Sequence, residues 1–217
     1  MRNTLETQLN DLNREILRMG QLVSEMIDNA VLSLSRQDVA LARQVIATDD
    51  EIDRLQIAIE VRSLQLMALQ QPMARDLRAV GTGLKLVTDL ERMADHATDI
   101  ADVTLRLSGE PLIKPLIDIP RMAGIAQDMV RAALDAYVRQ DEAAARAMIA
   151  RDDEMDALYK AMFDELVGMM EKDPQVVRQA TYLLHVSGWL ERIGDHATNL
   201  GEWTIYQLTG ELTDMNA

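Results

Sequence analysis

Two carboxylates four residues apart occur twice in the chain, in nearly identical surroundings. Seven of the nine residues from Leu90 to Thr98 recur 100 positions later, which indicates an internal repeat. On an α-helix, residues i and i+4 lie on one face, so each copy places two negative charges side by side. Neighbouring carboxylates are typical of sites that bind a cation. The two pairs are Glu91 with Asp95 and Glu191 with Asp195.

The preceding helices bring further carboxylates to the same level. In an antiparallel helix pair, residues equally far from the connecting turn lie side by side. With turns at 71–72 and 173–174, the acidic stretches 49–53 and 152–156 fall beside the repeated pairs. Counting back through one more turn brings Glu25 and Asp128 to nearly the same height. We therefore expect one cluster of carboxylates in each half.

Oxygen-only clusters suit Mg²⁺, Ca²⁺ or Mn²⁺, and also iron and zinc when several carboxylates bridge the ions. The alternative is a solvated acidic face balanced by Arg92 and Arg192, and the pattern alone leaves both interpretations open. His96 and His196 lie about 140° round the helix from Glu91 and Glu191, so we expect them to be structural residues. No catalytic nucleophile motif is present, and no enzyme is predicted.

The composition indicates an acidic, all-α protein. The chain has 217 residues, a formal charge of −14 and 48% hydrophobic residues, with few aromatic residues and 14 methionines. This charge argues against nucleic acid and anionic lipid as partners. The absence of cysteine excludes disulfides, and no apolar run approaches the ~20 residues needed to cross a bilayer. We expect a cytoplasmic protein with no direct membrane insertion.

Apolar residues at helical spacing predict three long helices in each half, over about 5–35, 39–70, 73–107, 121–139, 142–172 and 175–208. Short turns between them predict antiparallel three-helix bundles. The fold class is thus all-α, with two tandem, internally repeated bundles. The domain boundaries are 1–108 and 121–217, with a proline-rich linker at 109–120 and a frayed tail from Gly210.

Several motifs together resemble the PhoU family of phosphate transport accessory proteins. They are the doubled Leu-Glu-Arg-(Met/Ile)-(Ala/Gly)-Asp-His-Ala motif, Asp76-Leu77-Arg78, the Asp-Glu-(Ile/Met)-Asp motifs at 50–53 and 153–156, and 115–120 in the linker. The resemblance covers nearly the whole chain. It implies a largely dimeric cytoplasmic regulator that links the Pst phosphate ABC transporter to the sensor kinase PhoR and restrains phosphate uptake and the starvation response, peripheral to the inner membrane through these partners.

Members of the family carry Glu/Asp-x-x-x-Asp motifs that can hold multinuclear metal clusters. The resemblance therefore implies Mg, Mn, Zn or Fe sites of unknown identity. The second copy has Asn199 where the first has Asp99, which implies fewer or weaker cations there. The ligands so implied are Asp49, Asp53, Glu91, Asp95 and Asp99 in the first half and Asp152, Asp156, Glu191 and Asp195 in the second.

Two other functions stay open at this point. The clusters are also compatible with a metal-dependent enzyme or a metal store, although no separate nucleophile or base accompanies them. A related class of small proteins accompanies low-affinity phosphate permeases, and the sequence does not separate it from the Pst-linked class. A regulatory adaptor is the function that we expect.

Overall fold

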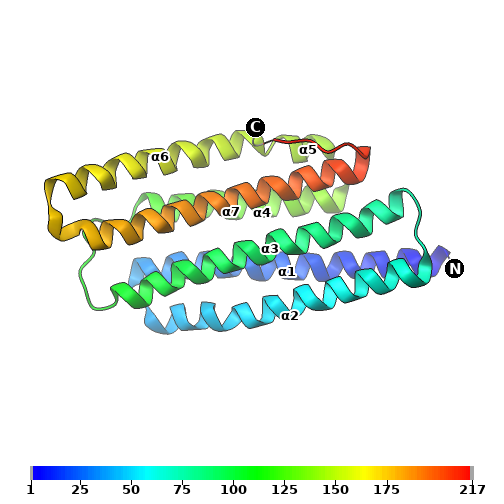
Figure 1. Ribbon diagram of the computed structural model, residues 1–217, viewed down its shortest axis with the longest axis horizontal. Helices are drawn as coiled ribbons and strands as arrows, with labels where there is room; N and C mark the ends of the chain where they lie inside the picture. Colours follow the sequence, from blue (N-terminus) through cyan, green and yellow to red (C-terminus); the bar gives the residue numbers. More distant parts are fainter. Residues whose placement is uncertain (1, 216–217) are drawn as a thin grey trace.

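The computed structural model describes residues 2–215, and the side chains of 5–148 and 150–215. Six long helices account for most of this part of the chain (Figure 1). The elements are α1 (Arg2–Arg36), α2 (Val39–Gln70), α3 (Arg75–Leu107), α4 (Asp118–Arg139), α5 (Glu142–Arg146), α6 (Ile149–Lys172), the 3₁₀ turn η1 (Pro174–Val176) and α7 (Val177–Thr209).

Equivalent turns end the first helix of each half. Gln37 and Gln140 adopt a left-handed backbone with φ of 54° and 55°, which terminates α1 and α4. Asp38 then accepts hydrogen bonds from the backbone N–H groups of Ala40 and Leu41, and Asp141 accepts one from Ala144. An N-cap of this kind satisfies donors that the first helical turn leaves free. The repeat thus extends to the capping residues.

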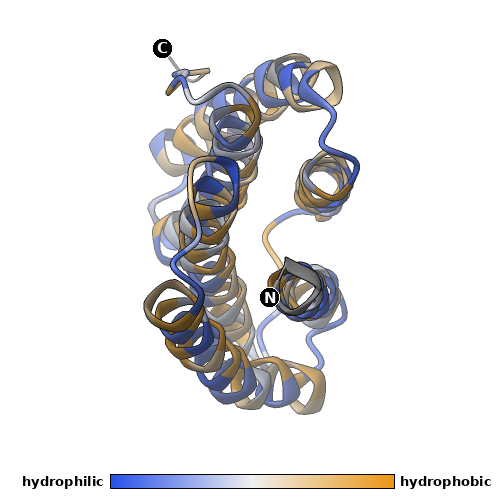
Figure 2. Ribbon diagram, turned by 90° about the vertical axis from the view of Figure 1, so that its right-hand side faces the viewer, coloured by the Kyte–Doolittle hydropathy of each residue, from blue (hydrophilic) through white to orange (hydrophobic). Residues whose placement is uncertain are grey.

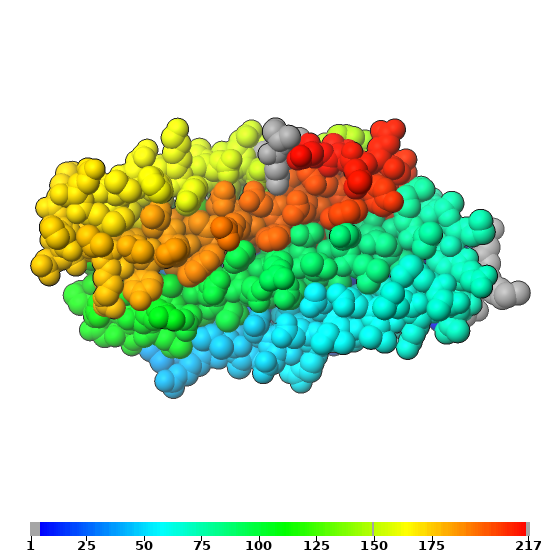
Figure 3. Space-filling view, in the orientation of Figure 1, coloured from blue at the N-terminus to red at the C-terminus, as the bar shows by residue number. Residues whose placement is uncertain are grey.

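The fold class predicted from the sequence is confirmed. In the first half α1, α2 and α3 contact one another, and in the second half α4, α6 and α7 do so. The halves meet along two helix pairs, α3 with α7 and α1 with α4, and no helix of the described residues inserts into the other bundle (Figure 2). On the face seen in Figure 3, α2, α3, α7 and α6 follow one another from bottom to top.

One apolar core passes through both halves. Buried side chains at spacings of three and four, such as Ile16, Met19 and Val23 on α1, form a stripe along each inner helix face. The same cluster of buried residues includes α3, α4 and α7. The two bundles therefore share a core in this structure, and independent folding of 1–108 and 121–217 stays a prediction; residues 1, 216 and 217 lie outside the described part.

The second half differs from the prediction in the start of its first helix and in a break in its second. The linker ends earlier, because α4 begins at Asp118 and includes Pro120 in its first turn, where the lost N–H has no helical partner. The helix predicted over 142–172 is broken at Ala147 and Met148 into α5 and α6. The tail leaves α7 at Gly210, and the backbone N–H of Met215 donates to Glu202 at 2.6 Å. No helix in the described residues has the length and apolarity to cross a bilayer.

Candidate carboxylate clusters

The first cluster lies where α2 packs against α3. Burial raises the pKa of Asp49 above its ordinary value, and the negative charges of Asp53 and Asp95 raise it further. Burial likewise raises the pKa of Glu91, with Asp95 as the next cause. Carboxylates affect one another in this way only at close range, since water screens distant charges. The structure therefore brings Asp49, Asp53, Glu91 and Asp95 together.

Positive charge is scarce in this cluster. Arg92 lies 3.1 Å from Asp95 and 3.5 Å from Glu91, and its own side chain is 58% exposed. Asp49 Oδ1 and Thr98 Oγ1 are buried; Thr98 lowers the pKa of Asp49 against the larger effect of burial, but neither atom has a hydrogen bond of normal geometry among the described residues. A buried carboxylate oxygen without a partner is costly, so Asp49 is suited to a ligand that the protein itself does not supply.

The second cluster lies at the equivalent place between α6 and α7. Burial raises the pKa of Glu191 to about 7, followed by the charges of Asp195 and Asp156. Burial raises the pKa of Asp152 to about 6, again with Asp195 and Asp156 as the next causes. The pKa of Asp195 is raised by burial and then by Asp156. Near neutral pH, Glu191 and Asp152 are therefore partly protonated, which reduces the negative charge of the cluster.

Each cluster includes a threonine from the helix that carries the repeated motif. Thr198 donates a hydrogen bond to Asp152 at 3.4 Å, and the equivalent Thr98 interacts with Asp49 in a way that partly offsets the rise in the pKa of that carboxyl. A cavity of about 720 Å³ also opens beside the second cluster. It is lined by Tyr159, Leu184, His185, Gly188, Trp189, Glu191, Arg192 and Asp195.

The predicted ligand Asp99 lies at the edge of the first cluster. Burial raises its pKa, and the charges of Asp95 and Asp102 add to the rise. Its counterpart Asn199 has another role, because its side-chain amide donates to Asp89 at 3.3 Å across the boundary between the bundles. The difference at this position therefore removes a carboxylate from the second cluster and adds a contact between the halves.

The two histidines pair with each other at the boundary between the bundles, and each also lies near a carboxylate, His96 at 3.7 Å from Asp99 and His196 beside Asp89. His96 and His196 lie between α3 and α7 with ring centroids 6.0 Å apart. Burial lowers the pKa of His96 to about 4, and the charge of His196 contributes next. His196 Nδ1 lies 2.9 Å from Asp89 Oδ1. The sequence did not identify Asp89, since its counterpart is Trp189 and the residue is therefore absent from the repeated motif.

Glu25 and Asp128, expected at the height of the clusters, make other contacts. Glu25 accepts a hydrogen bond from Gln21 at 3.0 Å and lines a groove between α1 and α4. Asp128 forms an ion pair with Arg131 at 2.5 Å. Neither is among the charges that raise the pKa values in the clusters. Whether a carboxylate joins a cluster thus depends more on the helix face that carries it than on its height along the bundle.

The donor chemistry of both clusters fits a hard cation, because every predicted ligand atom is a carboxylate oxygen. The unpartnered Asp49 Oδ1 and the raised pKa values agree with this chemistry. In the described residues, however, no three His, Asp or Glu side chains converge closely enough to hold one ion. Metal binding would require side-chain rotation about bonds that such partly exposed carboxylates leave free, and it stays a prediction.

The sequence matches a known family in both halves. The model of the PhoU domain matches residues 16–104 and 119–204. A curated protein of Clostridium acetobutylicum, named phosphate-specific transport system accessory protein PhoU homolog, is 42% identical over 216 residues, which is 99% of each chain. A protein of the same name from Caulobacter vibrioides is 39% identical and covers 94% of this chain and 89% of its own.

Solved structures show the same fold. The crystal structure of PhoU from Pseudomonas aeruginosa superposes with a TM-score of 0.91 at 33% identity, over 95% of this chain and 99% of that one. The structure of the phosphate transport system regulatory protein PhoU from Streptococcus pneumoniae gives a TM-score of 0.90 at 32% identity, over 97% and 99%. The likeness thus includes both bundles and their arrangement.

Proposed function

Because the chain belongs to the PhoU family, we propose that it is an accessory protein of a phosphate-specific transport system. The observation that carries this proposal is the match to a protein of that name over 99% of both chains, with both repeats included. Fold alone would not suffice, since one fold serves many functions. Here the relatives agree with the chain in fold and in length.

Within that role, we propose regulation without catalysis. The chain would link the Pst ABC transporter to the sensor kinase PhoR, and restrain phosphate uptake and the starvation response when phosphate is plentiful. It would act in the cytoplasm as a homodimer, at the inner membrane through its partners. The relatives' names, accessory and regulatory protein, support a non-enzymatic role. The charge of −14 favours basic partner surfaces and a salt-sensitive association.

We also propose that the carboxylate clusters hold metal ions. Asp49, Asp53, Glu91 and Asp95, with Asp99, would hold them in the first half. Asp152, Asp156, Glu191 and Asp195 would hold them in the second. A bound cation would supply positive charge that offsets carboxylate repulsion and would connect α2 to α3 and α6 to α7. The identity of the ion, among Mg, Mn, Zn and Fe, is left to measurement.

A gene deletion tests the regulatory function. In cells grown with abundant phosphate, loss of the gene should raise phosphate-starvation reporter expression, and the wild-type gene should restore repression. Affinity purification of the tagged chain from detergent-solubilised membranes should recover the transporter ATPase and the kinase, and recovery should decrease as salt increases. Unchanged reporter expression together with a purification that recovers a low-affinity permease would contradict the proposal and support the alternative accessory role.

A further inference from the structure

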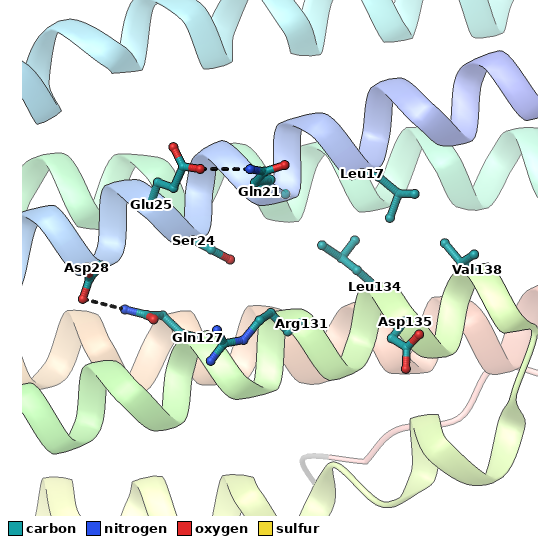
Figure 4. A pocket seen from close by; sticks show the side chains of 11 residues that line it. Leu17, Gln21, Ser24, Glu25, Asp28, Gln127, Arg131, Leu134, Asp135 and Val138 are labelled. Atoms are coloured by element: carbon teal, nitrogen blue, oxygen red, sulfur yellow. Dashed lines mark hydrogen bonds between the residues drawn. The ribbon is translucent and has the colours of Figure 1, made fainter.

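A groove runs between α1 and α4 on the side of the molecule away from α3 and α7. The two helices are antiparallel, because Asn13 accepts a hydrogen bond from Tyr137 at 2.7 Å whereas Asp28, further along α1, accepts one from the earlier Gln127 at 3.3 Å. The groove runs along this helix pair from the Asp28–Gln127 contact to Leu17 and Val138 (Figure 4) and has a volume of about 540 Å³. Volumes of this size accommodate several side chains of a ligand.

Gly20 lets the two helices approach each other under the groove. A Cβ atom at this position would lie 2.2 Å from Leu134 Cδ1, which is far inside van der Waals contact. Because residue 20 has no side chain, Leu134 packs directly over the backbone of α1. The base of the groove is therefore shaped by a specific residue pair.

The surface of the groove is apolar at one end. The side chains of Leu17, Leu134 and Val138 point into the space between the helices (Figure 4). Val138 is 48% exposed and, with Leu17 and Leu134, forms an apolar surface that a ligand can reach. All residues that line the groove belong to α1 or α4, so no other element of the described chain closes it. This leaves room for one more helix along the pair.

The charges at the rim are uncompensated on one side. Arg131 forms an ion pair with Asp128, and Asp135 forms one with Arg139. Glu25 and Asp28, in contrast, accept hydrogen bonds only from neutral amides, those of Gln21 and Gln127, in the contacts found among the described residues. A hydrogen bond from an amide leaves the negative charge of a carboxylate in place. The α1 rim therefore attracts positive charge.

These features discriminate between occupants. A second copy would present the same groove, since a two-fold contact joins like surfaces, and its Arg131 and Arg139 already pair with aspartates of their own helix. It would therefore add two more uncompensated carboxylates to the contact and, among the described residues that line the groove, no free cation to neutralise them. A basic segment has no such penalty. Apolar anchors at one end and acidic residues at the other match an amphipathic helix with Lys or Arg along one edge.

We propose that the α1–α4 groove binds an amphipathic, basic helix of a partner protein. Apolar residues at positions i, i+3 or i+4, and i+7 of that helix pack on Leu17, Leu134 and Val138. Its lysines or arginines meet Glu25 and Asp28. This inference does not depend on the carboxylate clusters, which are formed by other helices, nor on the identity of the transport system.

Two synthetic peptides test the chemistry. Both are stapled helices of about 18 residues, or five turns, with leucines at helical spacing; one carries lysines beside the leucines and the other carries glutamates. Fluorescence anisotropy with the full chain should show binding of the basic peptide alone. Replacing Val138→Asp should weaken it roughly tenfold or more, because a carboxylate would be buried against leucine. Equal binding of the two peptides, or binding of neither, overturns the proposal.

The chain offers a matched control. Val61 on α2 is also 48% exposed, so Val61→Asp introduces the same charge at the same exposure outside the groove, and should change the affinity less than about twofold. Circular dichroism should show that both variants fold. Glu25→Gln with Asp28→Asn should weaken binding and reduce its salt dependence, since both carboxylates supply the attraction.

Crosslinking in cells identifies the natural occupant. A photoreactive amino acid in place of Val138 in the full chain should crosslink to another protein, through a segment that mass spectrometry maps to a helix with the stated apolar and basic pattern. The same amino acid at Val61 should not label that segment. Crosslinks only between two copies of the chain would overturn the proposal and make the groove a dimer contact.

Discussion

The imidazole rings of His96 and His196 face each other across the boundary between the two bundles, with centroids 6.0 Å apart. These residues occupy equivalent positions in the sequence repeat. Contact between equivalent positions is what a two-fold axis produces close to itself. Outside this axis the equivalence continues, since the ion pair of Arg18 with Glu51 at 2.8 Å recurs as Arg121 with Glu154 at 3.0 Å. The chain thus resembles a dimer formed by two halves of one polypeptide.

We predict that this pair makes stability depend on acidity. The pKa of His96 is about 4 in the folded chain, below the ordinary 6.5, because the ring is buried beside His196. Keeping His96 neutral therefore costs no stability above pH 6.5. As the pH falls from 6.5 towards 4, the unfolded chain binds a proton that the folded chain does not, and the free energy of unfolding decreases. In the variant His96→Asn, the decrease in the free energy of unfolding over this pH range should be smaller by about 2 kcal/mol. Urea unfolding between about pH 4 and 7.5 measures it; an unchanged slope in the variant would refute the assignment.

The second cluster should have the opposite dependence in the metal-free chain. The raised pKa of Glu191, about 7, means that the folded state retains a proton that the unfolded state releases near 4.5. The retained proton therefore leaves the free energy of unfolding at its full value below pH 4.5, and this stability is lost as the pH rises through 7. In the variant Glu191→Gln, the loss of unfolding free energy with rising pH should be smaller by about 1 kcal/mol. The effect is no larger because solvent screens this half-exposed group. Chemical denaturation with a chelator at about pH 5 and pH 7.5 provides the comparison.

The control for that experiment is Glu171→Gln on the same helix pair, where the side chain is exposed. It should leave the pH profile unchanged. A decline of equal size in both variants would show that net charge, rather than the cluster, sets the dependence.

Two glycines within helices should respond differently to alanine. A Cβ atom added at Gly124 would meet nothing within 4 Å beyond its own helix, so Gly124→Ala should stabilise the chain by about 0.5–1 kcal/mol through helix propensity. Gly20→Ala places a methyl group 2.2 Å from Leu134 Cδ1 and should destabilise it by about 1 kcal/mol, because overpacking outweighs propensity. Thermal unfolding of the two variants decides; stabilisation by Gly20→Ala would mean that α1 and α4 separate easily.

Helical periodicity predicted most elements well, and Val39–Gln70 has the predicted bounds. The break at Ala147 and Met148 was missed because the stretch 142–150 contains no glycine or proline. The break coincides with a close tertiary contact: a Cβ at Gly201 of α7 would lie 3.4 Å from the carbonyl oxygen of Ala145 and 3.3 Å from Met148 Sδ. α5 therefore packs closely on α7, which no local pattern in the sequence reveals.

The carboxylate clusters were predictable because each is formed by two consecutive helices, whose alignment follows from the turn between them. Contacts between the halves were not predictable in this way. The bond of His196 with Asp89 and the groove between α1 and α4 both depend on how one bundle packs on the other. The repeat pointed to His96 and His196, yet it did not reveal that they would meet.

Cation binding by the clusters is the claim that connects the repeated motif to function. Metal should stabilise the folded chain by RT ln(1 + [L]/Kd), about 2.7 kcal/mol at a hundredfold excess over Kd. For a chain of this size that corresponds to a rise in Tm of about 5–10 °C. Glu91→Gln with Asp95→Asn should abolish the contribution of the first cluster and retain that of the second.

Calorimetry of the chelated protein, with and without Mg²⁺, Mn²⁺, Zn²⁺ and Fe²⁺, is the most direct measurement. At least one of these ions should raise the Tm of the wild-type chain, by less in the double variant, and elemental analysis should find that ion in the purified protein. If no cation raises the Tm and none is found, the carboxylates of both halves form a solvated acidic face.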